Sequence, residues 1–450
     1  MHTPYRPSRR TALGLGLGWF CWTLNPLGAQ AQTPPQSKEA PEWKAGPVKV
    51  HLRPDAADEA ELWRFDGGPA PVLRVRQGEE VRLRVSNGTP APLSLHFHGV
   101  RGPNAMDGVA GLTQAAVGPG EDFEYRFTPP DAGTFLIRPC IPGGSAEATE
   151  RGLTGLLIVE EITPPPVDSD IALVLDDWKL SETGALAPFG VDQGPSGRLG
   201  NWLTVNGGPV PERVEVRPGS RVRLRLANAS NARILRLQFD GMKPFVIAVD
   251  GQPTDTFEPL RASLPFPPGT RYDLLVDMPR QQDATGTVKA LLGNGIPLLQ
   301  LIAAGEVAAP KPAMAPIPEN RKLPEAIRLQ SATRADLAIT YDEGARAWRI
   351  NGKLGSVETP ALRVKRGAPV VLALDNRTPY PQPFHLHGHS FRLLHAMDDG
   401  WEPYWLDTLQ VPEKRTIRIA FVADNPGRWL LASTVLERFD AGLWCWIEVT

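Results

Sequence analysis

Two His-x-His pairs are the residues of this 450-residue chain whose types and spacing best support chemistry. His96 and His98 form the first pair, His385 and His387 form the second, and a glycine follows each pair. Side chains of a β-strand alternate between its two faces, so residues i and i+2 point the same way. Each pair can therefore direct two imidazoles at one point, and imidazole suits copper, zinc, iron or nickel. If the pairs lie on strands, they predict metal binding.

An internal repeat organises the chain around these pairs. Three segments share an alternating apolar and polar pattern, a glycine, and an asparagine nine positions later. The glycines and asparagines are Gly78 and Asn87, Gly219 and Asn228, and Gly367 and Asn376. The alternation is typical of half-buried strands, and we expect each glycine at a hairpin turn between two strands.

The histidine pairs start nine positions after the first and third asparagines, at residues 96 and 385. The middle repeat has Leu237 and Phe239 at that place. A single pair would be explained most simply as two polar residues on a strand face. Two pairs at matched positions, holding four of the eight histidines, favour a shared site. We therefore predict that histidines of the first and third repeats meet at the seam between them.

Three such repeats predict an all-β chain made of three β-sandwich domains. Proline-rich stretches at 163–166 and 310–318 mark the joints. The expected domains span residues 41–162, 168–307 and 320–450. Helix-length amphipathic patterns are scarce in all three, which agrees with an all-β fold.

The first 31 residues have the layout of an export signal. Arg9 and Arg10 resemble the twin-arginine signal, an apolar run follows at 13–24, and residues 29–31 offer a cleavage site. We expect segment 1–31 to be removed and the mature chain to be periplasmic, with no transmembrane segment. A net charge of −2 argues against nucleic-acid binding.

Several further motifs are shared with one protein family. They stand at 107–109 (Asp-Gly-Val), 151–155 (Arg-Gly-Leu-Thr-Gly), 269–277, 407–412 and 423–429. Together with the histidine pairs, they make nearly all of the mature chain similar to the multicopper oxidases, the family of laccases and copper-efflux oxidases. This resemblance implies three cupredoxin-like domains, which are Greek-key β-sandwiches. It also implies a type 1 copper that takes up electrons and a trinuclear cluster that reduces oxygen.

The chain departs from the family pattern at the type 1 site. There the family has two histidines and a cysteine, and this chain has Gln382, Arg438 and Ser433 in the matching positions. A type 1 copper needs a thiolate and two imidazoles. We therefore expect electron entry by this route to be lost.

The trinuclear ligands are only partly retained. Of these histidines, the chain keeps His96, His98, His385 and His387. Arg138 and Cys140 replace two others, and the last ligand segment of the family, which matches residues 432–443, has no histidine here. Arg138 also adds a positive charge where a cation would sit. We therefore expect neither a full four-copper set nor laccase activity.

The retained residues could still form a smaller site. In the family, His96 and His385 hold the type 2 copper, and His98 and His387 each bind one type 3 copper, while Cys140 stands at a former type 3 position. One interpretation is a residual mononuclear site for copper or zinc, built from these four histidines and Cys140. The other is that the histidines are remnants that hydrogen-bond within the seam. Cys140 could instead pair with Cys445 in an oxidising compartment.

Three functions follow from these alternatives. The first hypothesis is a non-enzymatic periplasmic protein that stabilises or scaffolds a protein partner, similar to the cell-division members of the family that lack a working copper set. The second is a copper-binding protein that uses the residual histidines. The third is an oxidoreductase with an altered mononuclear centre, a hypothesis that rests on Cys140 beside the histidines. We expect a monomer in each case.

Overall fold

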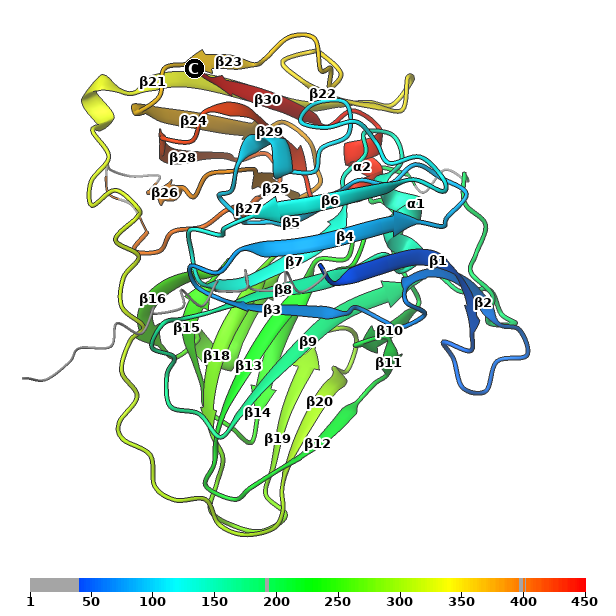
Figure 1. Ribbon diagram of the computed structural model, residues 1–450, viewed down its shortest axis with the longest axis vertical. Helices are drawn as coiled ribbons and strands as arrows, with labels where there is room; N and C mark the ends of the chain where they lie inside the picture. The colour runs from blue at the N-terminus through cyan, green and yellow to red at the C-terminus, as the bar shows by residue number, and fades with distance from the viewer. Residues whose placement is uncertain (1–39, 191–193, 396–399, 401) are drawn as a thin grey trace, which may run out of the picture. The chain divides into compact units, whose positions relative to one another are not determined.

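The computed structural model describes residues 40–190, 194–395, 400 and 402–450. The predicted export signal at 1–31 lies outside the described residues. The described residues form six β-sheets, two in each repeat, which confirms the all-β fold of three cupredoxin-like domains (Figure 1). No helix among these residues is long and apolar enough to cross a membrane.

The first domain packs two four-stranded sheets around one core, which includes Leu83, Phe97 and Leu157. One sheet has the order β2-β1-β4-β6, with β1 at Glu42–Val50, β2 at Ala60–Phe65, β4 at Val81–Asn87 and β6 at Asp122–Phe127. The other has the order β3-β8-β7-β5, with β3 at Val72–Arg76, β5 at Leu95–His98, β7 at Gly133–Pro139 and β8 at Gly155–Glu160.

The second domain is the green part of the chain in Figure 1, and its core includes Leu224, Phe266 and Leu301. Its larger sheet has the order β11-β10-β9-β13-β18-β15-β16. These strands are β9 at Ser169–Trp178, β10 at Trp202–Val205, β11 at Gly208–Pro209, β13 at Arg221–Asn228, β15 at Pro244–Val249, β16 at Gln252–Phe257 and β18 at Arg271–Asp277. The facing sheet, β12-β20-β19-β14-β17, has β12 at Glu212–Val216, β14 at Leu235–Asp240, β17 at Ser263–Phe266, β19 at Thr285–Ala290 and β20 at Ile296–Ala303.

The third domain repeats this plan around a core that includes Leu372, Phe384 and Trp429. One sheet, β22-β21-β24-β28-β26, has β21 at Thr333–Asp342, β22 at Ala347–Ile350, β24 at Ala368–Asn376, β26 at Arg392–Leu394 and β28 at Thr416–Ala423. The other, β23-β30-β29-β25-β27, has β23 at Leu362–Val364, β25 at Gln382–Leu386, β27 at Thr408–Val411, β29 at Gly427–Ser433 and β30 at Trp444–Val449. The short helices among the described residues are α1 at Ser145–Glu150, α2 at Leu436–Asp440, η1 at Asn104–Met106, η2 at Leu260–Ala262 and η3 at Leu329–Ser331.

The repeated glycine lies at a turn, but the turn is not the predicted hairpin. Gly78, Gly219 and Gly367 all have positive φ, at 94°, 70° and 83°, which suits glycine. The strands on either side belong to opposite sheets of each sandwich: β3 pairs with β8, whereas β4 pairs with β1 and β6. Each glycine therefore carries the chain across the sandwich, and the hairpin prediction is wrong because facing sheets share the same alternation of apolar residues.

The repeated asparagine explains why the histidine pairs stand at a fixed distance from it. In the first domain, the buried side chain of Asn87 donates to the backbone oxygens of Ala91 and Val117 and accepts from the backbone N–H of Thr89. Asn376 makes the matching bonds in the third domain, with the oxygens of Tyr380, Val411 and Pro412 and the N–H of Thr378. These bonds fix the loop that leads into β5 and into β25, and so place the first histidine of each pair.

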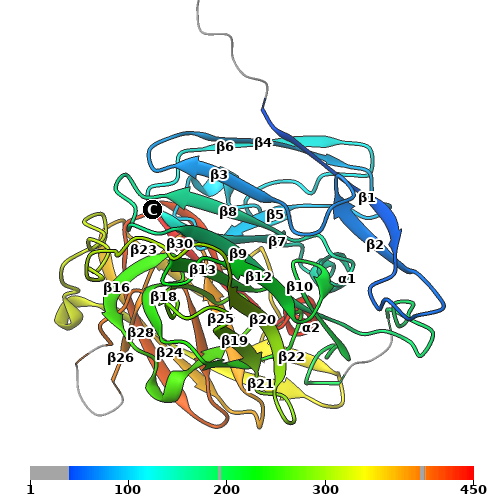
Figure 2. The ribbon, with the colours of Figure 1, turned by 90° about the horizontal axis from the view of Figure 1, so that it is seen from below.

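The first domain contacts both of the others. Strand β7 packs against β13 and β18 of the second domain, and α1 packs against α2 of the third (Figure 2). Asp440 of α2 accepts hydrogen bonds from the backbone N–H groups of Ser145 and Ala146, at 3.0 and 2.8 Å. These contacts hold together the seam on which β5 and β25 lie.

Candidate metal site at the seam of the first and third domains

The two histidine pairs face each other across this seam. His96 and His98 belong to β5, His385 belongs to β25, and His387 follows its last residue. The rings of His96 and His387 stack with centroids 3.7 Å apart, and those of His98 and His385 with centroids 3.5 Å apart. All four residues are buried. The structure therefore brings together four of the five sequence-predicted ligands.

Hydrogen bonds assign the proton in three of the rings. Nδ1 of His96 lies 2.7 Å from the backbone oxygen of Asp107, and Nδ1 of His385 lies 3.0 Å from that of Asp407. A carbonyl oxygen only accepts, so each Nδ1 donates and each Nε2 carries a lone pair. Nδ1 of His387 lies 3.0 Å from Oδ2 of the Asp107 carboxylate, which leads to the same tautomer.

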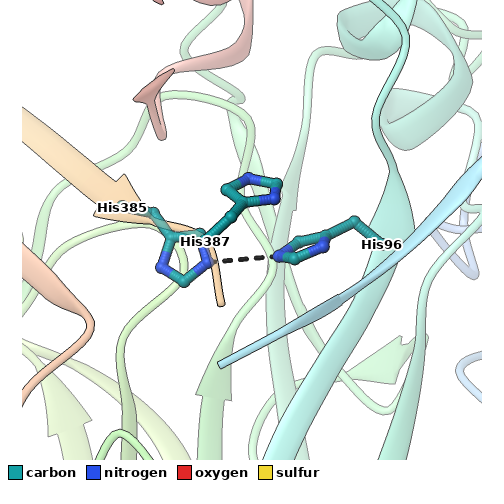
Figure 3. Close-up of side chains that lie close together, drawn as sticks. All are labelled: His96, His385 and His387. Atoms are coloured by element: carbon teal, nitrogen blue, oxygen red, sulfur yellow. Dashed lines mark hydrogen bonds between the residues drawn. The ribbon is translucent and has the colours of Figure 1, made fainter. Parts of the chain in front are cut away.

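The Nε2 atoms of His96 and His385 lie only 3.1 Å apart (Figure 3). With both Nδ1 protons in place, two lone pairs meet there, and an extra proton or a metal ion is needed to make the contact favourable. The ligand atoms of His96, His385 and His387 all lie within 4.8 Å of one another. Imidazole nitrogens gathered in this way are ligands that copper and zinc accept. These three residues therefore fit a mononuclear copper or zinc ion.

A second group of possible ligand atoms comes from His98, His385 and Asp407. Nε2 of His98 lies 3.1 Å from Oγ1 of Thr408, and that hydroxyl donates its hydrogen to Oδ1 of Asp407 at 2.7 Å. Nε2 of His98 is therefore the donor, and its Nδ1 is left with a lone pair. This buried Nδ1 has no hydrogen-bond partner among the described residues. Few buried polar atoms are left unpaired in folded proteins, so this atom too suits a ligand.

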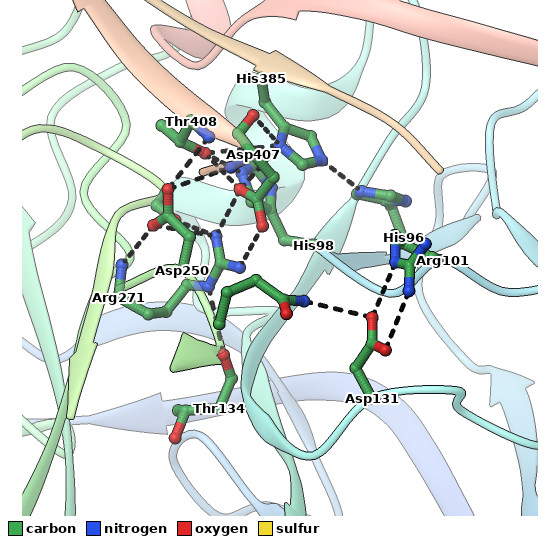
Figure 4. Close-up of polar contacts among 12 residues, drawn as sticks. His96, His98, Arg101, Asp131, Thr134, Asp250, Arg271, His385, Asp407 and Thr408 are labelled. Carbon is green, nitrogen blue, oxygen red and sulfur yellow. Dashed lines mark hydrogen bonds and ion pairs between the residues drawn. The ribbon is translucent and has the colours of Figure 1, made fainter. Parts of the chain in front are cut away.

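The second domain holds the carboxylate of this group in place. Arg271, at the start of β18, donates from Nη1 and Nη2 to the two oxygens of Asp407, at 2.9 and 2.5 Å (Figure 4). Its Nε donates to the backbone oxygen of Thr134 in β7, at 3.3 Å. Asp250 accepts from the backbone N–H of Thr408 at 3.1 Å. Residues from all three domains thus orient the histidines, in the manner of the outer shell of a metal site.

Burial sets the charge state of the rings. It lowers the pKa of His385 to about 3, and Asp407 offsets this only in part. Burial likewise lowers the pKa of His387 to about 4, against the opposing effect of Asp107. Burial raises the pKa of Asp107, but the contacts of His387 and His96 outweigh it and hold that pKa below its usual range. At neutral pH the site therefore has ionised carboxylates and neutral His385 and His387, which is the state a metal ligand requires.

Arg138 and Cys140, which in the sequence resemblance replace two family histidines, lie near these rings. Arg138 stands opposite His96 in the pairing of β7 with β5, and Cys140 comes just after β7. Cys140 shares a small cavity with the histidines but belongs to neither group of ligand atoms. Burial raises the pKa of its thiol far above the usual value, so it is protonated at neutral pH. Cys140 and Cys445 are both free thiols in the structure.

A hydrogen-bonded group occupies the positions at which the sequence resemblance would place type 1 ligands. Arg438 donates from Nη1 to Oε1 of Gln382 at 2.8 Å, and Gln382 donates from Nε2 to Oγ1 of Thr378 at 3.0 Å. Oγ of Ser433 accepts from the backbone N–H of Val435 at 3.2 Å. The guanidinium of Arg438 also lies over the ring of Trp348. An amide, a guanidinium and a hydroxyl are poor ligands for a type 1 copper, which needs thiolate and imidazole.

Sequence reasoning did not assign a ligand or orienting role to Asp407 or Arg271. Both stand in motifs that the chain shares with the family, at 407–412 and 269–277. A motif of that kind signals a shared fold, and only the structure shows that these two residues meet although 136 positions separate them.

Comparisons with known proteins agree with this architecture. Sequence profiles of the multicopper oxidases match residues 48–163, 173–287 and 321–450. The chain belongs to the multicopper oxidase family. The family implies copper, and the histidine and aspartate groups at the seam could bind a metal ion.

Relatives of two kinds are similar to the chain. The multicopper oxidase MmcO of Mycobacterium tuberculosis is 30% identical over 81% of this chain and 78% of its own length. The cell division protein FtsP of Photorhabdus laumondii is 26% identical over 88% of this chain and 86% of its own. Among solved structures, a multicopper oxidase from Pseudomonas thermotolerans has a TM-score of 0.82 and 32% identity, covering 91% of this chain and 98% of that one.

Proposed function

We propose that this chain is a periplasmic protein of the multicopper oxidase fold that lacks a type 1 copper and does not act as a laccase. Its role is to stabilise or scaffold a protein partner, as a monomer, in the manner suggested by its similarity to FtsP. The observation that carries the proposal is the bond between Arg438 and Gln382, because a fixed guanidinium stands where the family places a copper ligand. A buried cation there opposes a second cation.

Oxidase activity tests this proposal. The mature chain, loaded with copper, should lack the blue absorption band of a type 1 copper and should not consume oxygen with a phenolic substrate above the rate of free copper. The matched variant is Gln382→His/Ser433→Cys/Arg438→His, which restores the family's ligands on the same fold. We expect the blue band in the triple variant alone. A blue band in the natural chain would overturn the proposal.

A second candidate function is the binding of one copper ion by His96, His385 and His387. The lone pairs of His96 and His385, 3.1 Å apart, favour it, since remnants free to choose their tautomer would place a proton between them. The protein would then buffer or deliver copper rather than oxidise a substrate. His98, Asp407 and Cys140 are the further candidates for ligands.

Metal content separates the two functions. We expect about one copper per chain, with a type 2 signal in electron paramagnetic resonance, in untagged protein purified from copper-supplemented cells without chelator. The His96→Gln/His385→Gln variant should lose this copper, whereas His51→Gln, a change of an exposed histidine, should keep it. Stable, metal-free natural protein would refute copper binding and leave the scaffold role, whose partner can then be sought by pull-down.

A further inference from the structure

A cavity of about 360 Å³ lies where the first and second domains meet the proline-rich stretch at 310–318. Both domains and this stretch contribute to its lining, with Gly133 at the start of β7, Ala248 in β15, and Ile317 and Pro318. No histidine is among the described residues that line it, so it is separate from the candidate metal site. Cavities of this volume at the boundary of two domains commonly bind small molecules.

Buried hydrogen bonds hold one wall of this cavity in place. Asn320, just after the proline-rich stretch, donates from Nδ2 to Oδ1 of Asp131 at 2.7 Å and to Oε1 of Gln252 at 2.9 Å. Asp131 is only 3% exposed and also accepts from Nε and Nη2 of Arg101 (Figure 4). The stretch is thus tied to both domains. The cavity is therefore formed before a ligand enters, which lowers the entropy cost of binding.

Another part of the lining is apolar. Ile162, shortly after β8, lines the cavity and is 82% exposed. Ala248, Pro253, Ile317 and Pro318 continue this apolar surface. An alkyl chain that covered Ile162 would remove its surface from water, which favours binding in proportion to the area covered. The cavity therefore suits a ligand with an apolar body.

The charged groups at the cavity include two cations without a carboxylate partner. Glu161 binds Arg223 through both of its oxygens, at 2.7 and 3.0 Å, so these two charges compensate each other. Arg321 and Lys322 are exposed, and neither forms an ion pair within the described residues. Nζ of Lys322 donates to the backbone oxygen of Pro130 at 2.7 Å, which leaves its charge uncompensated.

The remaining acid at the cavity is Glu319. Its negative charge acts on Arg392 of the third domain, where it opposes the lowering of the pKa of that guanidinium by burial. Glu319 is thus shared with a third cation. The rim of the cavity therefore keeps an excess of positive charge, which an anionic group on a ligand could compensate.

We propose that this cavity binds an apolar molecule that carries one carboxylate, of the class of medium-chain fatty acids. The alkyl chain lies against Ile162, Ile317 and Pro318, and the carboxylate meets Arg321 and Lys322 at the rim. Hydrogen bonds between ionised groups are stronger than neutral ones, so the charge of the ligand adds to its affinity. An inorganic anion would leave the apolar lining in contact with water. This binding does not depend on the proposed scaffold role or on copper.

Calorimetric titration of the mature chain with decanoate, below its micelle concentration, tests the proposal. One decanoate should bind per chain, and decanol should bind about tenfold more weakly because its hydroxyl forms no bond between ionised groups. Arg321→Gln/Lys322→Gln should weaken the binding of decanoate about tenfold and leave that of decanol unchanged. The matched control, Lys353→Gln/Lys365→Gln, changes two exposed lysines of the third domain and should bind decanoate as the natural chain does.

A second pair of variants tests the apolar lining. Ile162→Asp changes an exposed side chain, so the fold should be kept while the binding of decanoate is lost. Leu260→Asp, at a position that is 84% exposed and does not line the cavity, should bind decanoate as the natural chain does. Absence of saturable binding, or binding that Ile162→Asp leaves unchanged, would overturn the proposal. Binding confined to peptides that end in an apolar residue would also overturn it and would indicate a protein C-terminus as the occupant.

Discussion

Replacing Arg271 by methionine should destabilise the protein by about 3–5 kcal/mol, because it leaves the buried carboxylate of Asp407 without its partner. Arg271 is fully buried and binds both oxygens of Asp407. Burial and the negative charge of Asp407 already raise the pKa of Asp250 to about 7. A second unpaired carboxylate beside it would therefore lower the stability of the folded chain further. The free energy of unfolding in urea, followed by tryptophan fluorescence, measures the loss.

A surface ion pair supplies the matched control. Arg363 donates to Glu448 at 2.6 Å, but its side chain is 70% exposed. Arg363→Met should therefore cost less than about 1 kcal/mol. In the double variant Arg271→Met/Asp407→Asn, part of the loss should be recovered because no unpaired charge remains. If Arg271→Met were as mild as Arg363→Met, the ion pair would not be what holds the three domains at the seam.

Replacing His387 by glutamine should remove one contribution to the protein's loss of stability in mild acid, beside those of His385 and His389, whose pKa values burial also lowers. The pKa of His387 is about 4 in the folded chain and about 6.5 when unfolded. Above pH 6.5 the ring is neutral in both states and contributes no pH dependence. As pH falls from 6.5 toward 4, this histidine binds a proton in the unfolded chain but not in the folded chain. The free energy of unfolding therefore falls by about 1.4 kcal/mol per pH unit. Below pH 4 the loss levels off.

The measurement is the difference in unfolding free energy between the natural chain and His387→Gln from pH 7 to pH 4, with chelator present. A difference is needed because Asp250 and Asp440, whose pKa values burial raises to about 7, titrate in the same range with the opposite sign. The natural chain should lose about 3 kcal/mol relative to the variant. His51→Gln, at an exposed position, should give a curve parallel to the natural one. Parallel curves for His387→Gln as well would mean that the folded ring takes up its proton as easily as the unfolded one.

The fold could be predicted from the sequence because its signals are local and recur. Gly78, Gly219 and Gly367 need positive φ at the same turn, and the asparagine nine positions on fixes the next loop through bonds to nearby backbone. What the repeat does not encode is which strands pair. Alternation in β3 and β4 looks the same whether the two strands share a sheet or face each other across a core, and this is why the hairpin prediction failed.

The site could be predicted only where spacing carried the information. His96 and His385 stand at matched offsets, and the structure puts their Nε2 atoms 3.1 Å apart. Asp407 and Arg271 have no such signal, since their ion pair joins different domains and neither sequence motif indicates which residue the other end of the pair will be.

The seam joins segments that are far apart in the chain, which affects the order in which its contacts form during folding. His96 and His385 are 289 positions apart, and Asp440 meets Ser145 across 295. Contacts of such long range carry a loop-closure entropy, so we expect them to form late in folding, after each sandwich has its own core. Until that step the imidazoles are open to solvent, and afterwards they are almost fully covered. A metal ion in this seam should therefore enter as the domains dock, and it should exchange afterwards only as fast as the domains part.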